Sequence, residues 1–205
     1  MYAYEEKYLK EGYRFIAGTD EVGRGPMAGP LVCAAVVLDP QSPIEGLKDS
    51  KQLSEKKRVA LEKEIKKKAL AFAVVFIEVK DIDKINVYQA SKLGMEKAVL
   101  SLELPVDFVL SDAMMLDVEM PVLKLIKGDQ KSASIAAASI LAKVARDEVM
   151  VRLDAEYPGY GFAQNKGYPT KEHKVALEKL GPSKVHRRSF KPVRVFFDAQ
   201  MSLKL

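Results

Sequence analysis

Short apolar runs alternate with segments of helical period along most of this 205-residue chain. The runs have the length of strands and are bounded by turn residues; they cover residues 15–20, 31–38, 70–79, 107–113 and 122–129. Helical periodicity is found at 55–69, 81–102 and 132–157. Alternation of this kind predicts an α/β fold, in which a sheet carries helices on its faces.

Capping residues sharpen two of the predicted helices. Ser54 is a predicted N-cap for 55–69, and Thr170 for a helix that Gly181 ends. The first half of 132–157 is dense in Ala and Ser, which lets a helix lie close to a sheet or another backbone. We expect a catalytic α/β domain over 1–160 and a small basic helical C-terminal region over 161–205.

Positive charge gathers near the C-terminus. Residues 164–205 hold ten Lys or Arg against three Asp or Glu, whereas the remaining residues hold 23 against 25. A near-neutral body with a basic end suits a phosphate-rich partner, and His186 beside Arg187 and Arg188 is expected on that basic face. The alternative is a solvated surface that aids solubility. The lysines of 55–69 are interpreted as the solvated face of a surface helix.

Composition excludes several classes of protein. No apolar run approaches the ~20 residues that span a bilayer, and the N-terminal residues contain no apolar stretch typical of a secretory signal. The single Cys33 lies within an apolar run, which predicts a small core residue in a reducing compartment. We therefore expect a cytoplasmic protein that does not contact membranes.

Acidic residues follow three of the predicted strands. Asp20 ends the first, Asp112 the fourth and Asp129 the fifth, and Glu21 follows Asp20 directly. Sites in open α/β sheets form beside the carboxyl ends of strands, and converging carboxylates repel each other unless a cation or protons join them. Oxygen ligands favour Mg²⁺ or Mn²⁺ over Zn²⁺. The alternative for any one of these acids is a turn former or a helix cap.

The connection after the first strand is unusually rich in glycine. Side chains alternate along a strand, so Asp20 and Glu21 face one ion only if the chain begins to bend near Glu21. Gly23 and Gly25 permit positive φ and a close approach of backbone to a ligand. Arg24 between them could bind phosphate or form a surface ion pair.

These residues belong to longer motifs. "GTDEVGRGPMAGPLVCAAVVL", from Gly18, resembles the signature of the type 2 ribonucleases H, specifically bacterial ribonuclease HII. Further blocks resemble that family in its own order: "LKDSKQLSEKKR" (47–58), "INVYQASKLGM" (85–95), "SIAAASILAKVARD" (134–147) and "YGFAQNKGYPTKEH" (160–173). The resemblance covers about residues 13–190 and implies a ribonuclease H-like mixed five-stranded sheet flanked by helices.

The resemblance also implies a reaction. The family cleaves the RNA strand of RNA/DNA hybrids and cuts 5′ to ribonucleotides embedded in duplex DNA, leaving 3′-OH and 5′-phosphate, a reaction of DNA replication and repair. It implies that Asp20, Glu21, Asp112 and Asp129 are catalytic ligands of two Mg²⁺ or Mn²⁺ ions. Asp147 is an alternative to Asp129 as the fourth metal ligand. Because Asp147 lies in the middle of a predicted helix and Asp129 at the end of a predicted strand, Asp129 is preferred.

Substrate contacts are implied as well. Gly23, Arg24 and Gly25 match the motif that senses the ribose 2′-hydroxyl, the local mark of RNA. Tyr168 matches a tyrosine that packs on the sugar beyond the scissile junction and contacts its 2′-hydroxyl. Lys51 and Ser134 resemble positions near the substrate backbone, with an ordinary surface role as the alternative.

Two further alternatives come from other classes. One is a different nuclease of the same fold, such as a junction resolvase or a type 3 ribonuclease H, although a type 3 enzyme is expected to carry an extra N-terminal substrate-binding domain. The other is a non-catalytic duplex-binding module, which the loss of an acid would mark. All four acids are present. We expect a monomer that binds RNA/DNA hybrids and ribonucleotide-containing duplex DNA.

Overall fold

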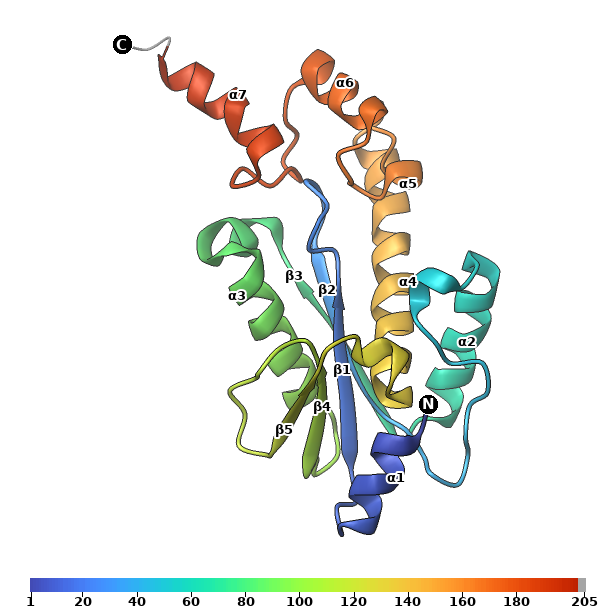
Figure 1. Ribbon diagram of the computed structural model, residues 1–205. Coiled ribbons are helices and arrows are strands. Elements are labelled where there is room, and N and C mark those ends of the chain that lie inside the picture. Colours follow the sequence, from blue (N-terminus) through green and yellow to red (C-terminus); the bar gives the residue numbers. More distant parts are fainter. Residues whose placement is uncertain (203–205) are drawn as a thin grey trace. The chain divides into compact units, whose positions relative to one another are not determined.

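The computed structural model describes residues 1–202, with side chains as far as Asp198 (Figure 1). Its elements, in chain order, are α1 (Ala3–Lys10), β1 (Ile16–Val22), β2 (Leu31–Val37), η1 (Ser50–Gln52), α2 (Glu55–Lys68), β3 (Ala71–Ile77), α3 (Val79–Leu100), β4 (Phe108–Asp112), β5 (Val122–Leu125), η2 (Gly128–Gln130), α4 (Ala133–Glu156), α5 (Phe162–Asn165), α6 (Lys171–Leu180) and α7 (Lys191–Ser202).

The five strands form one mixed sheet in the order β3-β2-β1-β4-β5. β1 pairs antiparallel with β2 and parallel with β4, which in turn pairs parallel with β5. The predicted α/β class with a five-stranded mixed sheet is therefore confirmed.

The chain divides into two compact units. The first contains Met1–Val22, Val32–Phe76 and Ser91–Ala145, and the second contains Gly23–Leu31, Ile77–Ala90 and the chain from Arg146 onward. The domain boundary at residue 160 stays a prediction.

Helices cover both faces of the sheet in the first unit. Val32, Ala34 and Val36 of β2 pack against the alanine-rich face of α4. Cys33 points to the other face, where its Sγ lies 3.8 Å from the carbonyl of Ser91 in α3. The thiol is fully buried, as predicted for a core cysteine.

Gly18 is where β1 and α4 approach most closely. A Cβ at Gly18 would lie 2.2 Å from the main-chain carbon of Ser134 and 2.3 Å from the main-chain nitrogen of Ile135. The alanine-rich half of α4 and this glycine together bring backbone against backbone. The predicted close approach of this helix to the sheet is therefore confirmed.

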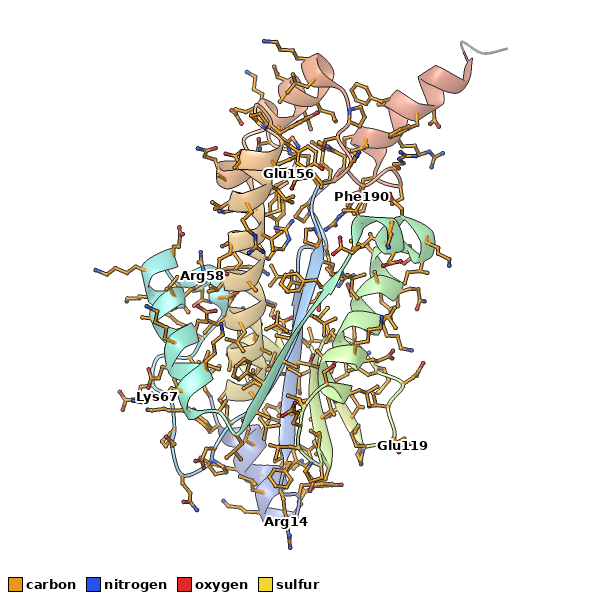
Figure 2. All side chains as sticks on the ribbon, turned by 180° about the vertical axis from the view of Figure 1, so that it is seen from behind. Arg14, Arg58, Lys67, Glu119, Glu156 and Phe190 are labelled. Carbon is orange, nitrogen blue, oxygen red and sulfur yellow. The ribbon has the colours of Figure 1, made fainter. Side chains whose placement is uncertain are left out.

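Both predicted caps are present. The hydroxyl of Ser54 accepts from the Lys57 amide at 3.4 Å, and that of Thr170 from the His173 amide at 3.2 Å. Lys67 points outward from α2, in keeping with the predicted solvated face (Figure 2).

Two strand ends that bear on the acidic residues differ from the prediction. β1 continues through Val22, so Asp20 does not end the strand and the chain does not bend at Glu21, because both remain in register with β2. β5 ends at Leu125, and Asp129 lies instead in the short helix η2. Helices α1, α5 and α7 had no clear signal in the sequence, because their stabilising contacts come from distant segments.

Candidate metal centre and ribose-contacting loop

Asp20 and Asp112 lie side by side on neighbouring strands. Thr19 pairs with Ser111 in the parallel ladder of β1 and β4, so the next residues, Asp20 and Asp112, are adjacent and share a face. Asp20 is only 5% exposed. Burial raises the pKa of Asp20 well above its ordinary value, and the charges of Glu21 and Asp112 raise it further. A bound cation would relieve this repulsion.

Asp20 and Glu21 project from opposite faces of the sheet. Asp20 pairs with Ala34, on the face covered by α4, and the Ser139 hydroxyl of that helix donates a hydrogen bond to its carboxylate. Glu21 pairs with Cys33, on the opposite face. The Glu21 amide donates to Asp20 Oδ1 at 2.7 Å, which fixes the Asp20 carboxylate against its neighbour. The two acids therefore reach one ion only around the end of the sheet.

Asp129, together with Asp49, lies close to Asp112. The Gly128 amide donates to Asp112 Oδ1 at 2.6 Å, which ties η2 to the end of β4. Burial raises the pKa of Asp129 in η2 to about 6, with further contributions from the charges of Asp49 and Asp112. The nearby ammonium of Lys51 opposes this rise. Asp129 thus belongs electrostatically to the same acidic region as Asp112.

Asp49 is a member of this region that the sequence interpretation overlooked. It is 8% exposed, accepts from the Lys51 amide at 2.9 Å and from Gln130 Nε2 at 3.3 Å. These contacts hold the loop with Lys51 against η2. Within the block 47–58, Asp49 carried only the signal of a turn former, and its position near Asp129 depends on folding.

The donor set suits a hard divalent cation. The acidic region supplies carboxylate oxygens, and among the described residues no three His, Cys, Asp or Glu side chains form a group that could hold an ion on their own. Mg²⁺ commonly uses one or two carboxylates and completes its shell with water and substrate phosphate oxygens. The open acidic arrangement fits that mode and offers no Cys or His cage for zinc.

The glycine-rich turn and Tyr168 lie together in the second unit. Gly23 has φ +107°, and a Cβ there would lie 2.4 Å from Arg146 Nε. Of the two glycines that permit positive φ, only Gly23 adopts it; at Gly25 a Cβ would instead lie 3.2 Å from Tyr168 Cε1. Arg24 is exposed between them, and the Tyr168 ring is 44% exposed. Gly23 is therefore required for local packing, and Gly25 for the close approach to an accessible aromatic ring.

Two fully buried arginines hold this turn. Their guanidinium groups donate to main-chain carbonyls: Arg146 to Pro30 (3.0 Å), Ala28 (3.2 Å) and Lys166 (2.9 Å), and Arg187 to Gly29 (3.0 and 2.9 Å) and Arg24 (3.3 Å). Burial lowers the pKa of Arg146 to about 10 and that of Arg187 to about 9, so both stay charged at neutral pH. The expected basic face at His186 and Arg187 is wrong, because both side chains are buried and serve the fold.

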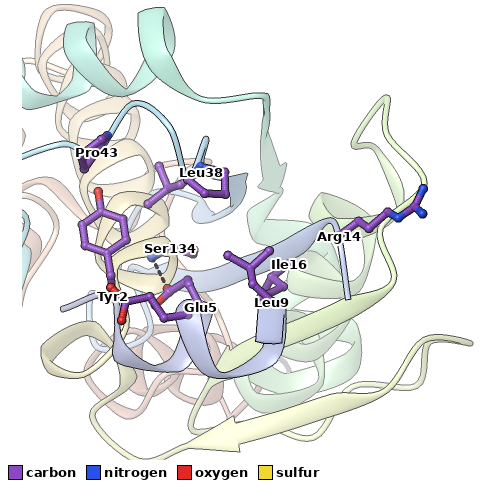
Figure 3. A pocket seen from close by; sticks show the side chains of 10 residues that line it. Tyr2, Glu5, Leu9, Arg14, Ile16, Leu38, Pro43 and Ser134 are labelled. Atoms are coloured by element: carbon purple, nitrogen blue, oxygen red, sulfur yellow. Dashed lines mark hydrogen bonds between the residues drawn. The ribbon is translucent and has the colours of Figure 1, made fainter. Parts of the chain in front are cut away.

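Ser134 lies at a different place in the first unit. It is fully buried, and its amide donates to Glu5 Oε1 at 2.8 Å beside a cavity of about 200 Å³ (Figure 3). Tyr2 and Pro43 also line this cavity, and none of the four predicted acids is among its lining residues in the described part of the chain. Glu5 thus binds the main-chain amide of Ser134 at the start of α4, whereas Lys51 is exposed near Asp129.

Over the described residues, no helix has the length and apolar character needed to cross a membrane.

Comparison with known proteins decides the family. Residues 17–193 match the family model described as ribonuclease HII. The chain is 53% identical over 194 residues to ribonuclease HII of Listeria monocytogenes serovar 1/2a, covering 95% of this chain and 74% of the relative. The chain belongs to the ribonuclease HII family. It is a ribonuclease H, an endonuclease that hydrolyses RNA in RNA/DNA hybrids.

Solved structures agree with this ribonuclease HII assignment. Ribonuclease H2 from Pyrococcus horikoshii OT3 is 28% identical, with a TM-score of 0.77 over 91% of this chain and 98% of that chain. Bst-RNase HIII in complex with Mn²⁺ is 20% identical, with a TM-score of 0.69 over 90% of this chain and 70% of that one. The second likeness concerns the ribonuclease H fold alone. The family match thus favours ribonuclease HII over the type 3 and non-catalytic alternatives.

Proposed function

We propose that this ribonuclease HII removes ribonucleotides from DNA, cutting 5′ to an embedded ribonucleotide as well as within RNA/DNA hybrids and leaving 3′-OH and 5′-phosphate. The observation that supports the catalytic part is that Asp20, which is buried, lies beside Asp112 on the adjacent strand; burial and the charges of Glu21 and Asp112 raise the pKa of Asp20. We expect the enzyme to act as a monomer in the cytoplasm, during DNA replication and repair.

Asp20, Glu21, Asp112 and Asp129 would hold the metal. When bound, two Mg²⁺ or Mn²⁺ ions would lower the pKa of an attacking water and stabilise the departing 3′ oxygen; the Mn²⁺ complex of the type 3 neighbour supports the use of divalent ions. The amide of Glu21 and the hydroxyl of Ser139 keep the Asp20 carboxylate oriented. Lys51, close to Asp129, is placed to contact a phosphate of the substrate.

Recognition of RNA would come from the second unit. Gly25 leaves room beside the exposed ring of Tyr168, so a ribose can lie on that ring while main-chain groups of the turn reach its 2′-hydroxyl. The carbonyls of Arg24 and Gly29 are held by Arg187, which keeps this turn rigid before substrate binds. Ser134 is fully buried, so its proposed contact with the substrate backbone would require a local opening at the start of α4.

A cleavage assay tests the proposal directly. The substrates are a DNA duplex with one ribonucleotide, an RNA/DNA hybrid and an all-DNA duplex, each with Mg²⁺, Mn²⁺ or chelator. We expect metal-dependent cuts 5′ to the ribonucleotide and none in all-DNA. Cleavage of the hybrid alone would overturn the proposed action on embedded ribonucleotides.

Asp129→Asn and Asp147→Asn separate the two candidates for the fourth acid. Asp129 shares its electrostatic environment with Asp112, whereas Asp147 is in the second unit and interacts with Arg146. We expect Asp129→Asn to lose about a hundredfold or more in turnover, because a ligand is removed. Asp147→Asn should keep most of its activity. Steady-state turnover at saturating Mg²⁺ measures both, and an inactive Asp147→Asn with an active Asp129→Asn would reverse the assignment.

Tyr168→Ala should alter substrate preference more than overall activity. At a lone ribonucleotide one sugar supplies all the recognition, so loss of the ring should lower kcat/KM there by on the order of tenfold or more. A long RNA tract offers many registers and should lose less. The measurement compares both substrates under one metal and salt condition. Equal losses would show that Tyr168 does not read the junction.

Exposed lysines of the second unit should contribute to salt-dependent binding. Replacing Lys171, Lys174 and Lys184 with Gln removes three exposed charges. If each contacts a phosphate, the slope of log affinity against log salt should fall by about 0.9 for each one. Duplex binding measured between 50 and 200 mM salt, the range over which such contacts are usually resolved, gives the slope.

A matched triple variant supplies the control. Lys56, Lys63 and Lys67 are exposed on α2, which we interpret as a solvated face. Replacing them with Gln makes the same change in net charge and should leave the slope almost unchanged. Equal effects of both triple variants would mean that overall charge, and not contact by the second unit, governs binding.

A further inference from the structure

Two buried histidines form an unbroken hydrogen-bonded chain in the second unit. His173 and His186 are 0% and 2% exposed, and their Nε2 atoms lie 3.1 Å apart. The outer nitrogen of His173, Nδ1, lies 2.8 Å from the carbonyl oxygen of Tyr168. The outer nitrogen of His186, Nδ1, accepts from the amide of Ser183 at 3.0 Å and lies 2.8 Å from the hydroxyl of the same serine, which can also donate to it. The chain therefore runs from Ser183 to the main chain of Tyr168.

The end groups allow one arrangement of protons along this chain. A carbonyl only accepts, so His173 carries its proton on Nδ1 and its Nε2 is an acceptor. A main-chain amide only donates, so His186 accepts at Nδ1 and carries its proton on Nε2. His186 Nε2–H then donates to His173 Nε2. Each ring is neutral, and each uses both nitrogens.

An extra proton on His173 would break the chain, because it would direct Nε2–H at the Nε2–H of its partner. Protonated His186 could donate from Nδ1 to the Ser183 hydroxyl, 2.8 Å away, but would direct the same N–H at the Ser183 amide and lose that hydrogen bond. The surroundings also disfavour charge, since the rings of Tyr160 and Phe162 pack against the pair at centroid distances between 4.9 and 6.4 Å. Burial lowers the pKa of both rings, and His173 lowers that of His186 further, to about 4.

The chain links two loops that both pair with the segment after the glycine-rich turn. The Met27 amide donates to Gly167 O, next to Tyr168, at 2.9 Å. On the other side, Gly29 N donates to Val185 O and Arg187 N donates to Met27 O, both at 2.9 Å. The histidine pair joins these loops to each other and so closes a triangle around residues 27–29. The exposed ring of Tyr168 projects from one corner, close to Gly25.

We propose that the His173–His186 pair positions Tyr168 and thereby sets the selectivity for lone ribonucleotides. The inference rests on the proposed role of Tyr168. Neither imidazole reaches a substrate, because both are buried; they act through the main chain of Tyr168. If the link from His173 is lost, the Tyr168 carbonyl keeps only its hydrogen bond from the Thr170 amide at 2.8 Å. The ring is then held less firmly beside Gly25, and cleavage of the substrate that depends on a single sugar decreases most.

The proton arrangement is tested first, without any reaction. Imidazole ¹⁵N chemical shifts of the intact protein distinguish the two tautomers. At neutral pH we expect His173 protonated on Nδ1 alone and His186 on Nε2 alone. A cationic ring, or the opposite tautomer in either histidine, would overturn the proposed chain.

Selectivity is tested with two substitutions that each keep half of the chain. The amide nitrogen of Asn overlies imidazole Nδ1, so His173→Asn keeps the donor to the Tyr168 carbonyl. The amide of Gln overlies Nε2, so His173→Gln keeps the contact with His186 and loses the one with Tyr168. We expect His173→Gln to lower kcat/KM for a lone ribonucleotide by on the order of tenfold relative to a long hybrid. His173→Asn should retain the ratio of the parent.

Tyr160→Phe is the matched structural control. It removes a partly buried hydrogen bond, from Tyr160 Oη to Gly181 O at 2.6 Å, beside the same two histidines. If Tyr160→Phe only lowers stability, kcat/KM should fall by the same factor for the lone ribonucleotide and for the long hybrid. Equal losses on both substrates in His173→Gln would reduce the pair to a structural role and overturn the proposal.

Failure of the inference is distinguishable from failure of the proposed function. If Tyr168→Ala changes the substrate ratio and His173→Gln does not, the positioning role alone falls. If Tyr168→Ala leaves the ratio unchanged, the role assigned to Tyr168 falls and the inference falls with it. If the thermal midpoint shows that His173→Gln folds poorly, the substrate ratio of His186→Gln is measured instead. An unchanged ratio in that variant, or ¹⁵N shifts of the parent that show the opposite tautomers, would overturn the proposal.

Discussion

Asp20→Asn is expected to lose cleavage by about a thousandfold or more while the folded protein becomes more stable in the absence of divalent ions. The substitution removes a proposed metal ligand, which accounts for the activity. It also removes a buried charge that Glu21 and Asp112 repel. The amide oxygen of Asn can still accept from the Glu21 amide, so the local geometry survives.

Two measurements check this result together. Turnover at saturating Mg²⁺ or Mn²⁺ reports the loss of a ligand, and the thermal midpoint with chelator reports the relief of repulsion. Added Mg²⁺ should raise the midpoint of the parent and raise it much less in Asp20→Asn, because stabilisation by a ligand depends on its affinity for the folded state.

Glu119→Gln is the control for net charge. Glu119 is exposed in the first unit (Figure 2), so its loss changes the charge by the same amount away from the acidic region. We expect normal turnover and a normal response to Mg²⁺. For Asp20→Asn, by contrast, a turnover within about tenfold of the parent would show that Asp20 is not a metal ligand.

Gly18→Ala is expected to destabilise the protein by about 3 kcal/mol or more. The new methyl group would meet the backbone of Ser134 and Ile135 at 2.2–2.3 Å, and backbone cannot rotate away as a side chain can. The strand and helix would have to separate, which disrupts the sheet face that carries Asp20. Urea unfolding monitored by circular dichroism measures the change in the free energy of unfolding.

Two companion variants identify the cause. Gly46→Ala meets nothing within 4 Å and suffers only from its positive φ of +76°, so it should cost about 1 kcal/mol. Ser134→Gly combined with Gly18→Ala should not restore stability, since the collision involves the main chain of residue 134. Rescue by the double variant would show that the Ser134 side chain, and not the backbone, sets the distance.

Local signals in the sequence determined the class of fold and most of its elements. The strands and the helices α2, α3, α4 and α6 follow from the spacing of apolar residues, and Ser54 and Thr170 cap the helices they were predicted to cap. These features depend on neighbours a few residues apart, so the sequence contains all the information they require. The motif around Asp20 and Gly23 indicated the family for the same reason, since it is a short continuous segment.

Tertiary structure alone decided how the acids and the basic residues are used. Asp20 remains within a paired strand because β2 continues beside it, and Asp129 joins Asp112 because the Gly128 amide binds that carboxylate. Arg187 was expected on a basic surface, but carbonyls of residues 24 and 29 surround its guanidinium. A charged side chain is buried only where distant backbone supplies hydrogen-bond partners, and no local pattern around residue 187 encodes where those partners will be.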